Sequence, residues 1–149
     1  GRILLTSSVS GILGSFGQAN YGAAKMGMVG LMNNLSREGA SHNVHVNCLS
    51  PGAATRMTAS VPGSEIDADN PDAANHPKLV SPAALYLVSE DAPNGRIIQA
   101  ARGRFASDMV FANKGMDLGL EPTWEDIADN SEEILDIGAA NLKTTFWVD

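Results

Sequence analysis

Two short apolar runs in the first third of the chain have the character of buried strands. Residues 2–8 read RILLTSS, and residues 44–50 read VHVNCLS and are followed by Pro51-Gly52. Apolar runs of this length that end in small or turn-forming residues are typical of strands in a parallel sheet. Residues 9–18 contain three glycines and predict a loop that needs backbone freedom.

The stretch of residues 19–42 has the periodicity of a helix. Its apolar side chains recur at the i, i+3, i+4 and i+7 positions of one helical face, at Met28, Leu31, Met32 and Leu35. Small residues in the same stretch permit close approach of another helix, although each glycine lowers helix stability by roughly 1 kcal/mol relative to alanine. Packing must compensate for this cost, and a subunit interface is one candidate for that packing.

Strand, loop, helix and strand in this order predict a βαβ unit with two parallel strands and a right-handed crossover. In open sheets of this kind, ligands bind at the carboxyl ends of the strands. Ser8 and Pro51-Gly52 both stand at such ends. The expected fold class is therefore α/β, with a doubly wound parallel sheet.

The second half of the chain carries weaker signals. Residues 53–80 are polar and rich in Pro, Asp and Asn, which indicates a long loop that is either a functional lid or disordered. Ser81-Pro82 predicts the start of a helix over residues 82–89, with Ser81 as N-cap and with Leu85 and Val88 buried. The other expected features are a turn at 94–95, a strand at 96–100, no readable period over 102–120, a helix at 124–136 and a tail at 141–149.

Composition and charge exclude several classes of protein. The 149 residues suffice for one domain with a real core. Residues 1–56 hold four basic residues and one acidic residue, whereas residues 57–149 hold six basic and sixteen acidic residues, which argues against binding to nucleic acid. No apolar run approaches the ~20 residues of a membrane span, and no signal peptide is recognisable. The lone Cys48 has no partner for an internal disulfide, which suits an intracellular, reducing compartment.

Three side chains in the first quarter of the chain suggest one proton-transfer site. Tyr21 and Lys25 stand at i and i+4, the spacing that places two side chains on one helical face. A phenol is mostly protonated at neutral pH, and a nearby ammonium favours its ionised form. Ser8 offers a hydroxyl to a substrate oxygen. These groups suit proton transfer to or from an oxygen, whereas no nucleophile elbow for acyl transfer is present.

The string TSSVSGILGSFGQANYGAAKMGMVGL, followed by VNCLSPG, resembles the catalytic half of the short-chain dehydrogenase/reductase family. The Tyr-x-x-x-Lys motif of that family corresponds to Tyr21-Gly-Ala-Ala-Lys25, and its serine, thirteen residues earlier, corresponds to Ser8. The neighbouring Ser7 and Ser10 are interpreted as loop residues. The resemblance implies the second half of a Rossmann-like sheet over residues 1–104, with a helical C-terminal extension of the same domain over residues 105–149.

The resemblance also implies roles for individual residues. Tyr21 would be the catalytic acid and base, Lys25 would lower the pKa of Tyr21 and hold the ribose hydroxyls of the nicotinamide, and Ser8 would orient the substrate oxygen. The cofactor would be NAD or NADP. Asn20 is expected to cap the helix or support the loop.

Further cofactor contacts are implied at the end of the second predicted strand. The backbone near Pro51, Gly52 and Ala53 would meet the nicotinamide carboxamide, and Thr55 would contact the diphosphate or the amide. The residues alone leave another interpretation of Gly52 open, that of a turn residue.

The second half of the chain is similar to the (3R)-hydroxyacyl-CoA dehydrogenase branch, which includes the peroxisomal multifunctional enzymes. The similar stretches are PGAATRMTASV, SPAALYLVSEDAPNGRIIQAARGRF and PTWEDIADNSEEILD. This implies a 3-hydroxyacyl thioester substrate, a cytoplasmic or peroxisomal location and a homodimer or homotetramer. Arg56 is interpreted as a solvated residue, with contact to a CoA phosphate as the alternative.

The family's glycine-rich nucleotide loop is not recognisable in this chain, because its glycines lack the Gly-x-Gly-x-x-Gly spacing. The chain therefore looks like a fragment whose cofactor-binding half lies elsewhere, and by itself it is expected neither to bind the dinucleotide tightly nor to turn over. A non-catalytic remnant that acts only by association is the alternative. The histidines and Cys48 show no metal-ligand spacing, so no metal site is expected.

Overall fold

The computed structural model describes residues 1–60, 64–67 and 73–138. The chain divides into two compact units, Gly1–Asp108 and Met109–Asp149. The first unit contains the sheet and all the residues predicted to take part in chemistry. The boundary expected at residue 104 remains a prediction about domain organisation.

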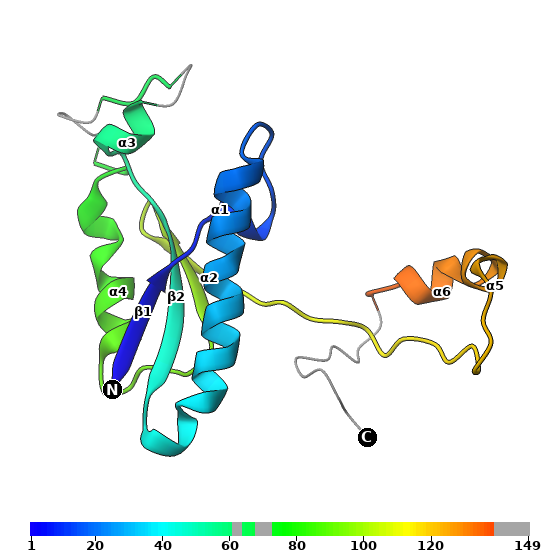
Figure 1. The fold of residues 1–149 in the computed structure, drawn as a ribbon. Helices are drawn as coiled ribbons and strands as arrows, with labels where there is room; N and C mark the ends of the chain where they lie inside the picture. Colours follow the sequence, from blue (N-terminus) through cyan, green and yellow to red (C-terminus); the bar gives the residue numbers. More distant parts are fainter. Residues whose placement is uncertain (61–63, 68–72, 139–149) are drawn as a thin grey trace. The chain divides into compact units, whose positions relative to one another are not determined.

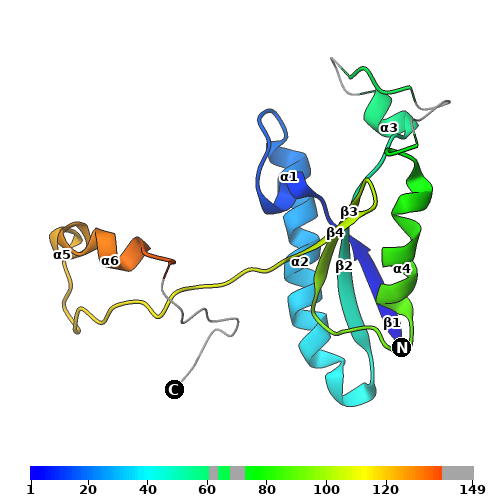
Figure 2. The ribbon, with the colours of Figure 1, turned by 180° about the vertical axis from the view of Figure 1, so that it is seen from behind.

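The first unit is built on a four-stranded sheet in which three strands run parallel (Figures 1 and 2). Its strands are β1 (Arg2–Thr6), β2 (His45–Gly52), β3 (Ile97–Ala101) and β4 (Arg104–Asp108), and they lie in that order. β1, β2 and β3 are parallel, and β4 pairs antiparallel with β3. The predicted βαβ unit with parallel strands is therefore confirmed, and the fold class is α/β.

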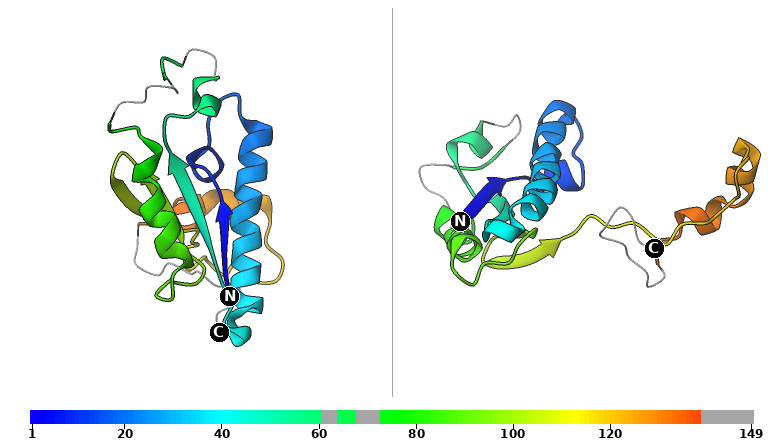
Figure 3. Two further views of the ribbon diagram at one scale, coloured as in Figure 1. Left: turned by 90° about the vertical axis from the view of Figure 1, so that its left-hand side faces the viewer. Right: turned by 60° about the horizontal axis from the view of Figure 1, so that its bottom comes forward.

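One long and one short helix cover the two faces of this sheet (Figure 3). Helix α2 (Ala19–Glu38) packs on one face, and helix α4 (Ser81–Val88) packs on the other. The core under α2 consists of Val29, Met32, Val46, Cys48 and Ile97. The core under α4 consists of Leu49, Ala83, Leu87 and Ala100. Residues of β2 alternate between the two cores, as the period of a strand requires.

The buried face of α2 agrees with the predicted one except at Leu31. Met32 is buried and Met28 and Leu35 pack against the same core, whereas Leu31 is 44% exposed. Val29 and Ser36 are also buried toward the sheet. Positions 29, 32 and 36 also satisfy helical spacing, and the sequence holds apolar residues on both sides of the true face. The helix ends at Glu38, before a short 3-10 turn, η1 (Ala40–His42), so its expected end at residue 42 is wrong.

The packing predicted for α4 is also wrong. Leu85 is 69% exposed and Val88 is 40% exposed, whereas Ala83 and Leu87 are buried one helical turn apart. The helix begins at Ser81 itself, and its N-cap is Val80. Ala83 is small and buried against the sheet, where α4 packs on β1 and β2.

In the polar stretch between β2 and α4, the described residues include two short helical elements rather than loop alone. Helix α3 (Arg56–Ala59) and the 3-10 turn η2 (Pro77–Leu79) lie within it. Residues 61–63 and 68–72 of the expected lid lie outside the described residues. The predicted lid function therefore remains a prediction.

Strand β4 lies in the segment whose sequence shows no period. It forms a hairpin with β3 through Arg102 and Gly103, both of which have positive φ angles, of 55° and 73°. Two such central residues are typical of the turn that matches the twist of paired strands. The side-chain amide of Gln99 on β3 donates to both carboxylate oxygens of Asp108 on β4, at 2.8 and 2.7 Å.

The described part of the second unit, up to residue 138, contains two short helices where one was expected. Helix α5 (Trp124–Asp129) and helix α6 (Ser131–Leu135) are separated at Asn130, so the single helix over 124–136 is wrong. Thr123 and Asp126 cap α5 reciprocally, and these hydrogen bonds lower the pKa of the Asp126 carboxyl. The tail predicted at 141–149 lies outside the described residues.

Candidate active site

Ser8 lies directly beyond β1 and begins a helix that the sequence did not predict. Residues 9–12 of the expected loop form α1 (Val9–Ile12), and Ser8 is its N-cap, with its hydroxyl oxygen accepting from the backbone N–H of Ser10 at 3.2 Å. An oxygen that accepts a hydrogen bond from the backbone still carries its own hydrogen. The Ser8 hydroxyl can therefore donate to a second oxygen.

Tyr21 and Lys25 are brought together on α2, as their spacing predicts. The Lys25 ammonium lies 5.7 Å from the centre of the Tyr21 ring, within the range of a cation–π contact. Tyr21 is 37% exposed. Its hydroxyl forms no hydrogen bond with the described residues, so the phenolic oxygen is available to a ligand.

The Lys25 side chain also reaches the end of β1. Its ammonium donates to the carbonyl oxygen of Thr6 at 3.1 Å, and Thr6 stands two residues before Ser8. A lysine ammonium has three N–H donors, and this bond occupies one of them. The Lys25 ammonium thus lies between the Tyr21 ring and the strand end that carries Ser8, with donors to spare.

Helix α1 packs tightly against the first turns of α2. A Cβ on Gly11 would lie 2.8 Å from the Cβ of Lys25 and 2.8 Å from the backbone nitrogen of Met26. A Cβ on Gly22 would lie 3.1 Å from the carbonyl oxygen of Ser10. The distances at Gly11 leave no room for a side chain, and the one at Gly22 is tight, so both glycines favour the close approach of the two helices. Figure 2 shows α1 beside the start of α2.

Two expectations about this segment are corrected, for Asn20 and Ser10, and the one for Ser7 is confirmed. Ser7 lies between β1 and α1, outside regular secondary structure, as interpreted. It is nevertheless 1% exposed, and its hydroxyl donates to the carbonyl oxygen of Lys25 at 2.9 Å. Asn20, expected as a cap, is the second residue of α2, whose N-cap is Gln18. Ser10 lies within α1 rather than in a loop.

Pro51 and Gly52 are the last residues of β2, so the strand continues through the predicted stop. They pair with Ala100 and Ala101 of β3, and both are exposed. A Cβ on Gly52 would lie 2.9 Å from the Cβ of Ala101, so glycine is required by close strand contact rather than by a turn. The exposed backbone at this position lies on the same edge of the sheet as Ser8.

Ala53 and Thr55 follow on the connection to α3. Ala53 is half-buried. The Thr55 hydroxyl accepts from the N–H of Thr58 at 3.2 Å, and the Thr58 hydroxyl accepts from the N–H of Thr55 at 2.7 Å. This reciprocal cap engages the Thr55 hydroxyl within α3. Its contact with a cofactor remains a prediction.

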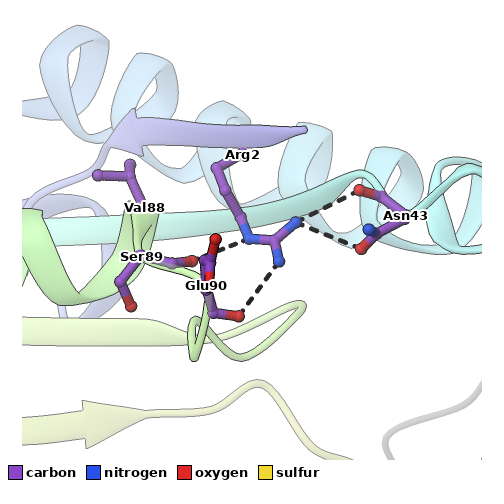
Figure 4. A pocket seen from close by; sticks show the side chains of 5 residues that line it. All are labelled: Arg2, Asn43, Val88, Ser89 and Glu90. Atoms are coloured by element: carbon purple, nitrogen blue, oxygen red, sulfur yellow. Dashed lines mark hydrogen bonds between the residues drawn. The ribbon is translucent and has the colours of Figure 1, made fainter.

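A hollow of about 400 Å³ lies at the amino end of β1, away from Ser8 (Figure 4). Arg2 points into it and donates to the backbone oxygens of Ser89 at 3.0 Å, Glu90 at 3.2 Å and Asn43 at 3.3 Å. These bonds tie the start of β1 to the end of α4 and to the turn before β2. Because its guanidinium donors are directed at these carbonyl oxygens, we assign Arg2 a structural role, that of holding these three segments together.

Two histidine side chains of the first unit, those of His45 and His76, contact the backbone. His45 Nδ1 lies 2.8 Å from the carbonyl oxygen of Ala92, and His76 caps η2 through the N–H of Lys78 at 3.1 Å. Within the described ranges, no three metal-ligating side chains gather in one place. In the same part of the chain, no helix combines the length and apolar character needed to cross a membrane.

Comparison with known proteins identifies the family. Residues 1–65 match the family described as short chain dehydrogenase. A Mycobacterium tuberculosis protein named as a short-chain type dehydrogenase/reductase is 38% identical, and the match covers 95% of this chain and 48% of that protein. An acetoacetyl-CoA reductase of an Acinetobacter species is 42% identical, and the match covers 60% of this chain and 38% of that protein.

The fold leads to the same family. The structure of full-length peroxisomal multifunctional enzyme type 2 from Drosophila melanogaster superposes with a TM-score of 0.74 at 36% identity, over 93% of this chain and 25% of that chain. The chain belongs to the short-chain dehydrogenase family. It spans about half the length of the mycobacterial relative and less of the others.

Proposed function

We propose that this chain carries the proton-transfer residues of an NAD(P)-dependent oxidoreductase that interconverts a secondary alcohol and a ketone. The single observation that carries the proposal is the arrangement of Lys25 between the Tyr21 ring and the end of β1. Membership of the short-chain dehydrogenase family supports it. The 3-hydroxyacyl thioester that we propose as substrate is supported by likeness to proteins named acetoacetyl-CoA reductase and peroxisomal multifunctional enzyme.

Tyr21 is the group that exchanges a proton with the substrate oxygen. Tyr21 is 37% exposed, its hydroxyl has no hydrogen-bond partner among the described residues, and its ring lies beside the Lys25 ammonium. In the proposed mechanism, the neighbouring Lys25 cation favours the negative charge that develops on the phenolic oxygen as it gives up its proton. In the direction of oxidation, Tyr21 accepts the alcohol proton, and in the direction of reduction it returns a proton to the carbonyl oxygen.

Ser8 directs the substrate oxygen toward Tyr21. Its hydroxyl is fixed by the N–H of Ser10, which leaves its hydrogen free to bond to the reacting oxygen. The serine thereby holds that oxygen while the proton moves. Because Ser8 begins α1 and α1 packs on α2, the geometry of the site depends on the contact between these helices.

The residues present fit a nicotinamide ribose. Lys25 uses one of its three N–H donors on Thr6 and has two left for vicinal hydroxyls. Pro51 and Gly52 are exposed at the carboxyl end of β2, where the chain would meet a carboxamide. The N–H of Thr55 and the carbonyl of Ala53 are bonded to the Thr58 hydroxyl, so a contact by Thr55 would have to displace that bond. When bound, such a dinucleotide supplies the acceptor for the hydride of the carbinol carbon. The choice between NAD and NADP is left open in this proposal.

We also propose that further strands continue the sheet beyond β1 and complete the cofactor site. β1 is an edge strand, and its apolar side chains Ile3, Leu4 and Leu5 are only partly covered. An unpaired parallel edge of this kind favours association with another strand. These strands would come from elsewhere in the same protein or from a partner. A homodimer or homotetramer and a cytoplasmic or peroxisomal location belong to the same proposal.

The test is turnover of a 3-hydroxyacyl-CoA with NAD⁺ and with NADP⁺, followed by nicotinamide absorbance. We expect activity in the protein that joins residues 1–149 to their continuing strands, and none in residues 1–149 alone. Tyr21→Phe should lower turnover by about 10²- to 10⁴-fold, with unchanged thermal unfolding. Tyr86→Phe, on the outer face of α4, is the matched control and should retain full activity. Near-normal turnover in Tyr21→Phe would overturn the proposal.

A further inference from the structure

Two buried serines stand side by side at the carboxyl ends of β1 and β2. Ser7 and Ser50 are each 1% exposed. The pairing of Thr6 with Leu49 brings them into register, and the N–H of Ser7 extends the ladder to the carbonyl oxygen of Leu49 at 2.8 Å. Since side chains alternate along a strand, both serines lie on the face that α2 covers.

The two hydroxyls differ in their partners. The Ser7 hydroxyl donates to the carbonyl oxygen of Lys25 at 2.9 Å, whereas the Ser50 hydroxyl has no hydrogen-bond partner in the described structure. The backbone of Lys25 is thus bonded to Ser7, and its ammonium is bonded to Thr6, the residue before. Two bonds of opposite sense clamp one residue of α2 to two consecutive residues at the end of β1.

We infer that Ser7 is a positioning residue for Lys25. Lysine has a long flexible side chain, so the place of its ammonium depends on how firmly its backbone is held. The Ser7 bond fixes the second turn of α2 against the strand end, and from there the ammonium reaches Thr6 and the Tyr21 ring together. The functional part of this inference rests on the proposed function, because it assumes that Lys25 acts in the site.

The adjacent serine provides a matched control. Ser7→Ala and Ser50→Ala each remove one buried hydroxyl from neighbouring strand ends, but only Ser7→Ala removes a bond to α2. A purely structural role for buried polarity predicts similar effects of the two substitutions. If the hydrogen bond from Ser7 positions Lys25, only Ser7→Ala should affect Lys25. Ser7→Thr keeps the hydroxyl and tests rescue, and Ser7→Cys keeps the volume with a weaker donor.

The first experiment is independent of any enzyme activity. Competitive acetylation of the folded chain, followed by mass spectrometry, gives the rate of Lys25 modification relative to the exposed Lys78. We expect Ser7→Ala to raise the relative rate about threefold or more, as expected for the loss of one hydrogen bond. Ser7→Thr should restore it, Ser7→Cys should give an intermediate rate, and Ser50→Ala should leave it unchanged. Equal rates of Lys25 acetylation in Ser7→Ala and the unmodified chain would overturn the inference. This comparison does not depend on whether Ser7→Thr or Ser7→Cys folds.

The second experiment measures nucleotide dependence in the active protein. Ser7→Ala should raise KM for the dinucleotide by about threefold or more, and Ser7→Thr should reverse the change. Ser50→Ala should keep the original KM. If the unmodified protein has no turnover, the proposed function fails, and the acetylation rates still decide whether Ser7 positions Lys25. An equal rise of KM in Ser7→Ala and Ser50→Ala would overturn the inference.

Discussion

Gly11 and Lys25 approach each other so closely that no side chain fits between them. A Cβ at position 11 would lie 2.8 Å from the Cβ of Lys25, well inside van der Waals contact. The contact joins α1, which Ser8 begins, to α2, which carries Tyr21. The absence of one methyl group therefore sets the spacing between the elements that hold the three candidate catalytic side chains.

Gly11→Ala should push α1 away from α2. Overpacking of this kind costs about 1–3 kcal/mol, and the displacement of Ser8 should lower turnover as well. Gly27→Ala is the control, because a Cβ there meets nothing within 4 Å, and alanine should raise helix stability by up to about 1 kcal/mol. Urea unfolding of both variants checks the prediction. A destabilised Gly27→Ala together with a neutral Gly11→Ala would contradict it.

Lys25→Met should weaken nucleotide binding and turnover with little loss of fold. Methionine keeps most of the aliphatic stem, but it removes the cation beside Tyr21 and the donor to Thr6. We expect turnover to fall by about 10²-fold or more. Lys78→Met, on η2, removes an exposed cation and should have no comparable effect. Turnover assays on both variants check the prediction, and equal losses in Lys25→Met and Lys78→Met would contradict it.

Asn47 should be among the residues most sensitive to substitution. It is fully buried on β2, its side-chain oxygen accepts from the N–H of Arg96 at 3.0 Å, and its amide donates to the carbonyl oxygen of Pro93 at 2.7 Å. Asn47→Asp turns the amide donor into an acceptor facing a carbonyl, and we expect a loss of about 3 kcal/mol or more. In the control Asn34→Asp, the affected bond to Gly30 is exposed, so the loss of unfolding free energy should be small.

Cys48 should make stability fall in alkaline solution. Burial in the core under α2 raises the pKa of its thiol from 9.0 to about 11. The unfolded chain therefore loses this proton before the folded chain does, and stability present below pH 9 is lost as the pH rises toward 11, by up to about 1.4 kcal/mol per unit. Urea unfolding against pH should show a steeper fall for the unmodified chain than for Cys48→Ala. Parallel curves would exclude this contribution.

The exposed face of α2 offers a test of the proposed association of copies. Leu31 is 44% exposed, and Gly27 and Gly30 on the same side leave open space beside it. Leu31→Glu should convert dimers or tetramers to monomers without unfolding the chain, whereas Leu31→Met should preserve them. Sedimentation velocity measures both. An unchanged oligomer in Leu31→Glu would exclude this face as the interface.

The elements with strong periodicity were predictable from sequence, and those formed by tertiary pairing were not. The parallel strands, the helix between them and the turn at Gly95 follow from short apolar runs, helical spacing and turn residues. β4 reads RFASD, and four of its five residues are exposed, so no burial pattern marks it. Its strand character comes from pairing with β3 through the turn at Arg102 and Gly103.

The candidate site shows the same division. The proximity of Tyr21 and Lys25 follows from a spacing of four within one helix. The contacts of Thr6, Ser7 and Gly11 with Lys25 join residues 14 to 19 positions apart, and no local pattern announces them. Two serines in a row at a strand end were the available signal, and only burial separates the roles of Ser7 and Ser8.

The spatial order of the strands is also their order along the chain. During synthesis on the ribosome, each newly emerged strand can therefore add to the outer side of the strand made just before it. No strand has to wedge between two that are already joined. The hairpin of β3 and β4 closes over a two-residue connection, whereas β1 and β2 must await the whole intervening helix, so we expect β3 and β4 to pair faster than β1 and β2.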